Sequence, residues 1–201
     1  MNQIKLILLW IVIFTLLSCS AKVIPPEIVP TPEAEIVEEG NSEADARQEK
    51  YERGIAAMSV HDYSAARRIF AEFIRENPQM AGAYTNMALI HFENQAYEQA
   101  LKLAERAIEL NNRQSQAYNL RAQLLIINGA VLEARNDYLK AIELNPQYSN
   151  AHYNLALLYD LYLQDVKLAL RHYEIYMSLI MQPDEATQNW IEHLNRTLRN
   201  G

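Results

Sequence analysis

The sequence predicts an all-α fold, a solenoid of stacked helix-turn-helix units closed by a capping helix at the C-terminus. The main observation is a repeat with a period of 34 residues, clearest where residues 81–112 align with residues 115–146. A fixed period of this length is the signature of a solenoid. A second observation is that the apolar residues inside each copy have helical spacing. A third is composition, since the 201 residues include only five glycines, too few for a protein built from strands and loops.

Each copy predicts two helices joined by a short turn. In the copy that begins at residue 81, Tyr84, Met87 and Ala88 fall at positions i, i+3 and i+4 and mark one face of a first helix. A second apolar stripe follows from Ala100 and predicts a second helix. The polar stretch at residues 93–96 lies between the two stripes and predicts the turn.

Four copies fit a repeat region at residues 44–182, at about 47–80, 81–114, 115–148 and 149–182. The second helix is expected to end before a proline, as at Pro78 and Pro146, because the residue before proline is disfavoured in the helical region. The fourth copy fits only with one extra residue near 162–164. Small residues recur where two helices must approach closely. They are Gly54, Ala88, Ala122 and Ala156 on the first helices, and Ala66, Ala100, Ala134 and Ala169 on the second.

The recurring order of small residue, turn, alanine and final proline resembles the tetratricopeptide repeat over about residues 47–181. The resemblance implies a right-handed superhelix in which the first helix of each unit lines a concave groove. It also implies that the groove receives an extended or helical peptide of a partner protein. The first and fourth copies depart from the pattern, with Lys50 and His152 where the middle copies have Tyr84 and Tyr118.

Carried over residue by residue, the resemblance gives a set of expected groove residues on the four first helices. They are Tyr51, Ile55, Thr85, Asn86, Leu89, Phe92, Asn119, Gln123, Ile126, Tyr153, Asn154, Leu157 and Asp160. Amides at these positions can bond a peptide backbone, while apolar side chains supply contact area. Ordinary packing between repeats is the alternative role for each apolar member. The set has no Lys or Arg, which makes the carboxylate-clamp subfamily a poor match.

Residues 183–201 predict a capping helix. Trp190, Ile191 and Leu194 lie at helical spacing. Asp184 and Glu185 suit the N-terminus of a helix, where negative charge is favourable. Such a helix would cover apolar surface that a further repeat would otherwise bury.

Residues 1–18 predict a signal peptide. Lys5 precedes the apolar run from Leu6 to Leu17, which would span about 18 Å as a helix, less than the ~30 Å hydrocarbon core of a bilayer. An uncleaved membrane anchor is the alternative. The stretch Leu16-Leu17-Ser18-Cys19 resembles the lipobox of bacterial lipoproteins. The resemblance implies attachment of lipid, with acyl chains such as palmitate, at Cys19 and a membrane anchor there.

The lipobox resemblance also implies a location. Residue 20 is Ser and not Asp, which in enterobacterial lipoproteins favours the outer membrane. We therefore expect the protein in the bacterial cell envelope, anchored in the inner leaflet of the outer membrane and facing the periplasm. Residues 19–43 are expected to form a disordered tether, because they combine four prolines with an acidic excess. Whether the length of this tether matters for function is left open.

Charge and motif content exclude several classes of function. The formal net charge is -7, but residues 46–201 hold 16 basic and 18 acidic residues, so the repeats have no basic excess and nucleic acid is not an expected partner. No phosphate-binding loop, nucleophile elbow or zinc-protease motif is present. His91 and His152 lie on apolar helix faces and are interpreted as packing residues. We expect no enzyme activity, no cofactor and no metal site.

The expected function is that of a lipid-anchored periplasmic adaptor that binds another envelope protein in its groove. A lipobox joined to such repeats resembles the pilotin lipoproteins, which assist assembly of type IV pilus and secretin systems. It is also similar to repeat lipoproteins that recruit peptidoglycan hydrolases. Self-association is a further alternative, since all twelve tyrosines lie within the repeats and could form an interface. The sequence leaves the identity of the partner and the oligomeric state open.

Overall fold

The computed structural model describes residues 27–29 and 42–200, and helices are the regular secondary structure in those ranges. The elements are α2 (Ser42–Ser59), α3 (Tyr63–Glu76), α4 (Ala81–Glu93), α5 (Tyr97–Leu110), α6 (Ser115–Ile127), α7 (Val131–Leu144), α8 (Ser149–Leu157), the π-helix η1 (Leu158–Tyr162), α9 (Val166–Leu179) and α10 (Glu185–Asn200). The prediction of an all-α fold is confirmed. The predicted signal peptide, Cys19 and most of the predicted tether lie outside the described residues. Within the described ranges, no helix is both long and apolar enough to cross a membrane.

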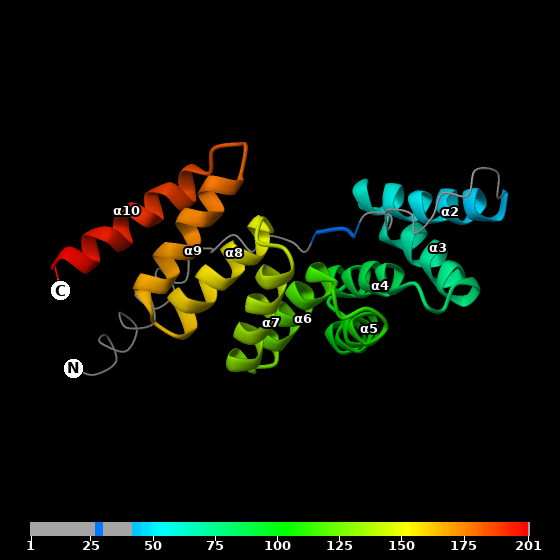
Figure 1. Cartoon of the computed structure of the whole chain (residues 1–201), viewed down its shortest axis with the longest axis horizontal. Helices are drawn as coiled ribbons and strands as arrows, with labels where there is room; N and C mark the ends of the chain where they lie inside the picture. Colours follow the sequence, from blue (N-terminus) through cyan, green and yellow to red (C-terminus); the bar gives the residue numbers. More distant parts are fainter. Residues whose placement is uncertain (1–26, 30–41, 201) are drawn as a thin grey trace, which may run out of the picture.

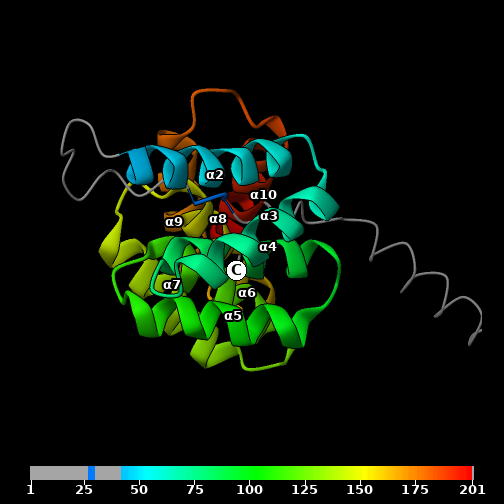
Figure 2. The same ribbon diagram turned by 90° about the vertical axis from the view of Figure 1, so that its right-hand side faces the viewer.

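The helices pack as consecutive pairs, α2 with α3, α4 with α5, α6 with α7, and α8 with α9. Figure 1 shows these pairs side by side along the length of the molecule, with α10 beside α9 at the C-terminal end. Figure 2, a view along that length, shows the pairs stacked one behind another. Each pair also contacts the next, through α3 and α4, α5 and α6, and α7 and α8. The predicted solenoid with a helix covering its end is thus confirmed.

Each helix pair turns through one residue in the left-handed region of backbone space. These residues are His61 (φ 60°), Gln95 (φ 59°), Gly129 (φ 77°) and Gln164 (φ 54°). The first three are 34 positions apart, and the fourth follows 35 positions after Gly129. In the first three turns the next residue donates its backbone N–H to the carbonyl five positions earlier, as from Ala130 to Leu125 at 2.9 Å. The sequence repeat is therefore also a repeat of turn geometry.

The extra residue of the fourth copy is absorbed in the last turn of its first helix. α8 continues as the π-helix η1, in which the Leu163 N–H donates to the Leu158 carbonyl at 3.1 Å. The turn bond then runs from Asp165 to Tyr159 at 2.9 Å, spanning one residue more than its counterparts in the other copies. A π-turn places one additional residue inside a helix without lengthening the loop. The following helix α9 consequently still pairs with α8.

The second helices of the first three pairs end at asparagines. Asn77, Asn111 and Asn145 each donate the backbone N–H to the carbonyl four residues earlier, at 2.8, 2.9 and 2.9 Å. Pro78 and Pro146 follow the first and the third of these asparagines and prevent further helix, because proline disfavours the helical conformation in the preceding residue. These helix ends therefore follow from local sequence.

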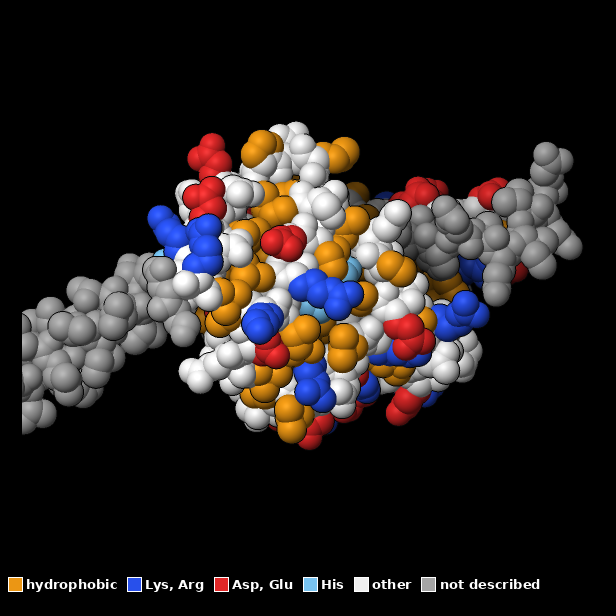
Figure 3. All heavy atoms as spheres, turned by 60° about the vertical axis from the view of Figure 1, so that its left-hand side comes forward, with side chains coloured by type: hydrophobic (Ala, Val, Ile, Leu, Met, Phe, Trp, Pro, Cys, Tyr) orange, Lys and Arg blue, Asp and Glu red, His pale blue; other side chains and the backbone are white. Residues whose placement is uncertain are grey.

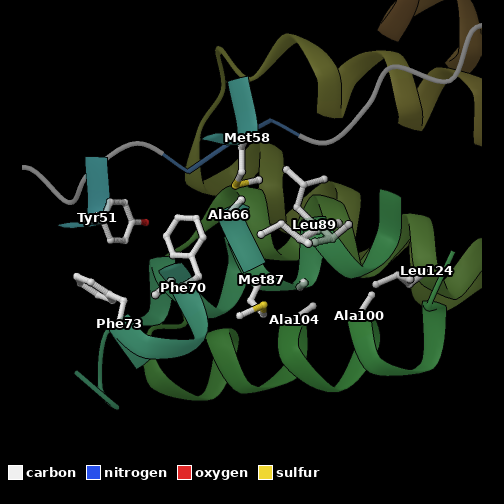
Figure 4. Close-up of a cluster of buried hydrophobic side chains, with 14 residues drawn as sticks. Tyr51, Met58, Ala66, Phe70, Phe73, Met87, Leu89, Ala100, Ala104 and Leu124 are labelled. Carbon is white, nitrogen blue, oxygen red and sulfur yellow. The ribbon is translucent and has the colours of Figure 1, made fainter. Parts of the chain in front are cut away.

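Small residues fill the places where the two helices of a pair meet. The seven alanines predicted there are 0% exposed, and Gly54 is buried as well. A Cβ atom at Gly54 would lie 2.8 Å from two ring carbons of Phe70, so the glycine lets α2 pack directly on this ring. Figure 4 shows Phe70 beside Tyr51 and Phe73 in a cluster of buried side chains. The rings of Tyr51 and Phe70 meet edge to face, with centroids 5.4 Å apart.

Candidate functional site

The candidate site is the face formed by the first helices α2, α4, α6 and α8, which carries the expected groove residues. Eight of the thirteen are buried, and the other five (Ile55, Phe92, Ile126, Leu157 and Asp160) are partly exposed. Asn86 and Asn119 are 0% exposed although their side chains are polar. A buried amide is costly unless it is hydrogen-bonded, so the partners of these amides indicate what the face is built to hold.

Asn86 binds the backbone of a segment from the N-terminal side of the repeats. The Val29 N–H donates to Asn86 Oδ1 at 2.8 Å, and Asn86 Nδ2 donates to the Val29 carbonyl at 3.0 Å. One amide side chain thus satisfies both backbone polar groups of one residue. Figures 1 and 2 show residues 27–29 as a short blue segment that belongs to none of the helices and crosses the solenoid. This segment belongs to the stretch that the sequence predicts as a disordered tether.

Tyr51 completes this subsite from α2. Its hydroxyl accepts a hydrogen bond from Asn86 Nδ2 at 3.0 Å and donates to the Val29 carbonyl at 3.5 Å. Burial raises the pKa of Tyr51, so the hydroxyl keeps its proton and remains a donor. The ring is packed edge to face against Phe73, with centroids 5.2 Å apart. The position of the hydroxyl is therefore fixed by the core of the first repeat.

The absence of a side chain at Gly82 makes room for the Tyr51 hydroxyl that bonds to Val29. A Cβ atom at Gly82 would lie 2.7 Å from the Tyr51 hydroxyl and 3.4 Å from Val29 Cγ1. Val29 is only 7% exposed, and Ile28 packs against the same apolar cluster. The subsite therefore receives both the backbone and the side chain of one extended, branched residue.

A second group of polar residues continues the face on α6 and α8. Asn154 Nδ2 donates to Asn119 Oδ1 at 3.1 Å, and Asn119 Nδ2 donates to the Tyr148 hydroxyl at 3.4 Å. The pKa of Tyr148 is raised, chiefly by burial and secondarily by the charge of Glu27, while a hydrogen bond from the Glu27 backbone acts in the opposite direction. The Glu27 backbone therefore lies close to the Tyr148 hydroxyl. The three-residue segment spans the distance from the Asn86 subsite to this second group.

Gln123 is a buried amide without a hydrogen-bond partner among the described residues. It is 6% exposed, and neither its Nε2 nor its Oε1 is bonded there. It occupies the position in α6 that Leu89 occupies in α4, and it follows Asn119 by one helical turn. Such unsatisfied groups are rare in protein interiors and need a specific explanation. They are one donor group and one acceptor whose hydrogen-bonding capacity the described residues do not use.

The helix α10 covers the part of the face that comes from the fourth repeat. Trp190 Nε1 donates to Asp160 Oδ2 at 2.6 Å, and the Tyr173 hydroxyl donates to the same oxygen at 3.3 Å. Tyr153 packs on the ring of Tyr176, with centroids 4.9 Å apart. The expected groove residue Asp160 therefore contacts the capping helix. The partly exposed apolar residues Ile55, Phe92 and Ile126 lie outside this contact, on α2, α4 and α6.

Sequence reasoning missed Val29, Gly82 and Tyr148. One signal was present for Gly82, because the equivalent positions in the other copies hold Gln48, Gln116 and Asn150. A glycine in place of long polar side chains indicates a close approach by another part of the chain. Val29 lies in a proline-rich stretch without periodicity, and its contact with Asn86 spans 57 residues of sequence. No local pattern could have indicated it.

The chemistry of the face is that of backbone recognition and apolar contact. The expected groove residues include no basic side chain and one carboxylate, Asp160, which is already bonded to Trp190. Among the described residues, no group of three or more His, Cys, Asp or Glu is placed to hold a metal ion. Figure 3 shows basic, acidic and apolar side chains interspersed on the outer surface that it displays. This distribution agrees with the near balance of charge in residues 46–201.

Comparison with known proteins identifies the repeat. A family model described as Tetratricopeptide repeat matches residues 51–114, and a second model described as TPR repeat matches residues 123–160. The mouse Protein O-mannosyl-transferase TMTC3 is 36% identical over 83 residues, which is 41% of this chain and 9% of that protein. The human Serine/threonine-protein phosphatase 5 is 31% identical over 94 residues, 47% of this chain and 19% of that protein. The chain therefore spans less than a fifth of the length of these relatives.

Solved structures share the solenoid at low sequence identity. The structure described as the functional characterization of Pseudomonas aeruginosa pilF has a TM-score of 0.70 and 18% identity, and the match covers 80% of this chain and 72% of that one. A protein from Thermus thermophilus, described as a thermophilic TPR protein, has a TM-score of 0.64 and 19% identity, with coverage of 76% and 82%. At these identities the similarity is one of fold.

Proposed function

Because the chain folds as a tetratricopeptide-repeat solenoid, we propose that it is an adaptor without enzyme activity, whose concave face binds an extended segment of another protein. The observation that carries this proposal is the pairing of Asn86 with both backbone groups of Val29, at 2.8 and 3.0 Å. A side-chain amide that binds main chain in this way selects extended conformation and tolerates many sequences. Leu89, Phe92 and Ile126 would supply the apolar contacts that add sequence preference.

The proposed setting of the adaptor is the bacterial cell envelope. Its support is the resemblance of Leu16–Cys19 to a lipobox, which would anchor the protein through lipid at Cys19 in the inner leaflet of the outer membrane. The partner would then be another envelope protein on the periplasmic side. The similarity in fold to the Pseudomonas aeruginosa pilF structure favours a machine of the pilus or secretin type. Recruitment of a peptidoglycan hydrolase is the alternative role for the same groove.

The groove proposal is tested by cross-linking in envelopes and recovery of the protein with its partners. Phe92→Ala combined with Ile126→Ala removes two partly exposed apolar side chains from the face and leaves the Asn86 subsite in place. We expect at least a fivefold loss of recovered partner. Val60→Ala is the matched control, since Val60 is 72% exposed and lies outside the face. Equal recovery from all three proteins would contradict a role for the groove.

The anchor proposal is tested by fractionation of membranes. Cys19→Ser removes the atom to which lipid would be attached, so the protein is expected to remain unprocessed and to lose the lipid-dependent membrane fraction. Ser18→Ala, at the neighbouring position, is the control and should be processed as the wild type is. A Cys19→Ser protein with the wild-type mass and the same lipid label would overturn this part of the proposal.

Self-association is a second candidate function, favoured by exposed apolar residues on α7. Leu132 and Leu139 are 56% and 41% exposed and lie seven positions apart, on one face of the helix. Light scattering of the wild type and of Leu132→Glu distinguishes the candidates. If the protein self-associates through this face, the molar mass of the particles should be lower for Leu132→Glu than for the wild type. If it acts as a monomer, the two molar masses should be the same.

A further inference from the structure

A segment of the chain itself lies against the first helices of this protein, where Val29 is bonded to Asn86 and Tyr51. We propose that Glu27–Val29 is an intramolecular ligand that occupies the Asn86 subsite until a partner segment displaces it. This inference rests on the proposed function, since it regulates the same groove. It assigns to the tether a role in binding that its composition does not indicate.

The contacts of Val29 are those of a bound peptide. Both of its backbone polar groups are bonded to Asn86, and its carbonyl also receives the Tyr51 hydroxyl. Its side chain is buried next to Gly82, with an exposure of 7%. Two side chains of the face, the Asn86 amide and the Tyr51 hydroxyl, therefore converge on one residue, and Gly82 leaves the space that this hydroxyl needs.

The local sequence prepares this segment for binding. Pro26 and Pro30 flank Glu27–Val29. Val29 precedes a proline and is therefore restricted to extended conformations, which are those that the Asn86 amide recognises. A restricted segment loses less conformational entropy when it binds than a flexible one does. The prolines thus favour occupation of the subsite by this part of the tether.

The contact is suited to displacement. It consists of a few hydrogen bonds and one buried branched side chain, and these gains are of the same order as the entropy lost in ordering three residues. What favours the bound state is connection, because residues 30–41 link the segment to α2 and keep its effective concentration high. A partner with a longer complementary segment would gain additional contacts, for example with the partly exposed Phe92 and Ile126, and would displace Glu27–Val29.

The partner that fits this device presents an extended segment with a β-branched apolar residue at the Asn86 subsite. Its apparent affinity is reduced by the fraction of molecules in which Glu27–Val29 is bound, because only the open fraction can accept it. Occupation by the tether thus raises the partner concentration needed for binding. It also disfavours partner segments that contact the face through a single residue, because these gain no more contacts than Glu27–Val29 does.

The test uses the full chain in detergent micelles and a fluorescent peptide with the sequence of residues 25–32, PPEIVPTP. Val29→Asp places a charge in the buried position and should release the segment without altering the repeats. The peptide is expected to bind Val29→Asp at least tenfold more tightly than it binds the wild type. Val37→Asp, the same substitution elsewhere in the tether, is the control and should behave as the wild type does. Equal peptide affinity for all three chains, or no binding to any of them, would overturn the proposal.

Hydrogen exchange of the Val29 amide gives an independent measurement. In the wild type this amide should exchange at least tenfold more slowly than in Asn86→Ala, with Asn112→Ala, an exposed position, as the control for a lost asparagine. Equal exchange in all three would contradict the docked state. The two proposals can fail separately. If the Phe92→Ala/Ile126→Ala protein loses its partner but Val29→Asp does not change peptide affinity, the adaptor proposal stands and the intramolecular ligand is refuted. If Val29→Asp raises peptide affinity but the Phe92→Ala/Ile126→Ala protein recovers its partner normally, the segment binds as proposed and the adaptor role of the groove is refuted.

Discussion

At the scale of single residues, two histidines of the last helix pair form a neutral, hydrogen-bonded unit. The Nδ1 atoms of His152 and His172 are 3.1 Å apart, and His152 Nε2 lies 3.2 Å from the Pro146 carbonyl. A carbonyl only accepts, so Nε2 of His152 carries the proton and its Nδ1 accepts from His172. The expectation that His152 is a packing residue agrees with its exposure of 4%.

This pair should make the stability of the protein depend on pH. Burial, with the nearby His152 and Arg171, lowers the pKa of His172 from 6.5 to about 4. The unfolded chain therefore binds the proton more readily than the folded one, and the contribution of His172 is complete above about pH 6.5 and is lost as the pH falls toward 4. Allowing for partial exposure, we expect a loss of roughly 1–2 kcal/mol in the free energy of unfolding.

Urea denaturation at pH 7 and pH 4.5 measures this effect. Carboxylates also titrate in that range, so the informative quantity is the difference between proteins. His172→Gln should show a smaller loss of stability on acidification than the wild type. His193→Gln, at an exposed position on α10, should lose as much as the wild type. The same loss in His172→Gln and in the wild type would contradict the assignment.

A second residue-scale prediction concerns the ion pair between α6 and α7. Arg121 Nε and Nη2 donate to the two carboxylate oxygens of Asp137 at 2.6 and 2.8 Å, and Asp137 is 7% exposed. Asp137→Ala would leave the partly buried guanidinium without its partner, at a cost of about 2–3 kcal/mol in unfolding free energy. Glu98→Ala removes the partner of Lys102 in an exposed pair, and it should leave the stability close to that of the wild type. Similar costs for the two substitutions would argue against a structural role for the buried pair.

At the scale of elements, the turns between paired helices carry a local strain that only one copy relieves with glycine. Gln95 has a φ of 59°, the conformation that Gly129 adopts at the equivalent place. Gln95→Gly should therefore stabilise the protein by about 0.5–1 kcal/mol, since glycine enters the left-handed region without the steric cost of a side chain. Chemical denaturation measures the change. Gln99→Gly, on the exposed side of α5, should destabilise by about 1 kcal/mol, and a loss of stability at both positions would refute the argument.

The elements also define how far the fold could be predicted. The helix pairs follow from the 34-residue period, and their ends follow from residues such as Asn77 and Pro78 that act on neighbouring backbone. The extra residue in the fourth copy could be detected from the register, but its accommodation as a π-helix depends on how α8 packs against α9. Local sequence thus predicted where the helices begin and end, whereas the π-helix in the fourth copy depends on packing between helices.

The candidate site was predictable only where it follows the repeat. Thr85, Asn86 and Asn119 lie on the expected face because their positions in the copy place them there. The occupant of the face was not predictable, because the bonds between Val29 and Asn86 join residues 57 positions apart and one of them belongs to a segment with no periodicity. The role of Asp160 depended in the same way on the position of α10.

At the scale of the whole molecule, the solenoid is a series of units in which each contacts only its neighbours. The described residues form one apolar cluster from α2 to α6, a second from α6 to α10, and a small third one of Ala141, Tyr148 and Ala151. In such an architecture, stability is close to a sum of repeat and interface contributions. A change at one end should therefore act locally, and the two ends can open independently.

The capping helix allows this locality to be tested. α10 is held by Ile191 and Leu194, which are 7% and 5% exposed, and by the hydrogen bond from Trp190 to Asp160. Asp160→Ala would leave the indole N–H and the Tyr173 hydroxyl without this acceptor, at a cost of about 1–3 kcal/mol for the docking of α10. Amide exchange in α10 and in the adjacent part of α9 should then become about tenfold faster or more, while exchange in α2 to α5 stays unchanged. Glu192→Ala, at an exposed position of the same helix, is the control and should leave all rates as they are. An increase spread evenly over the chain would mean that the repeats unfold as one cooperative unit, and the groove and its cap could then not be regulated separately.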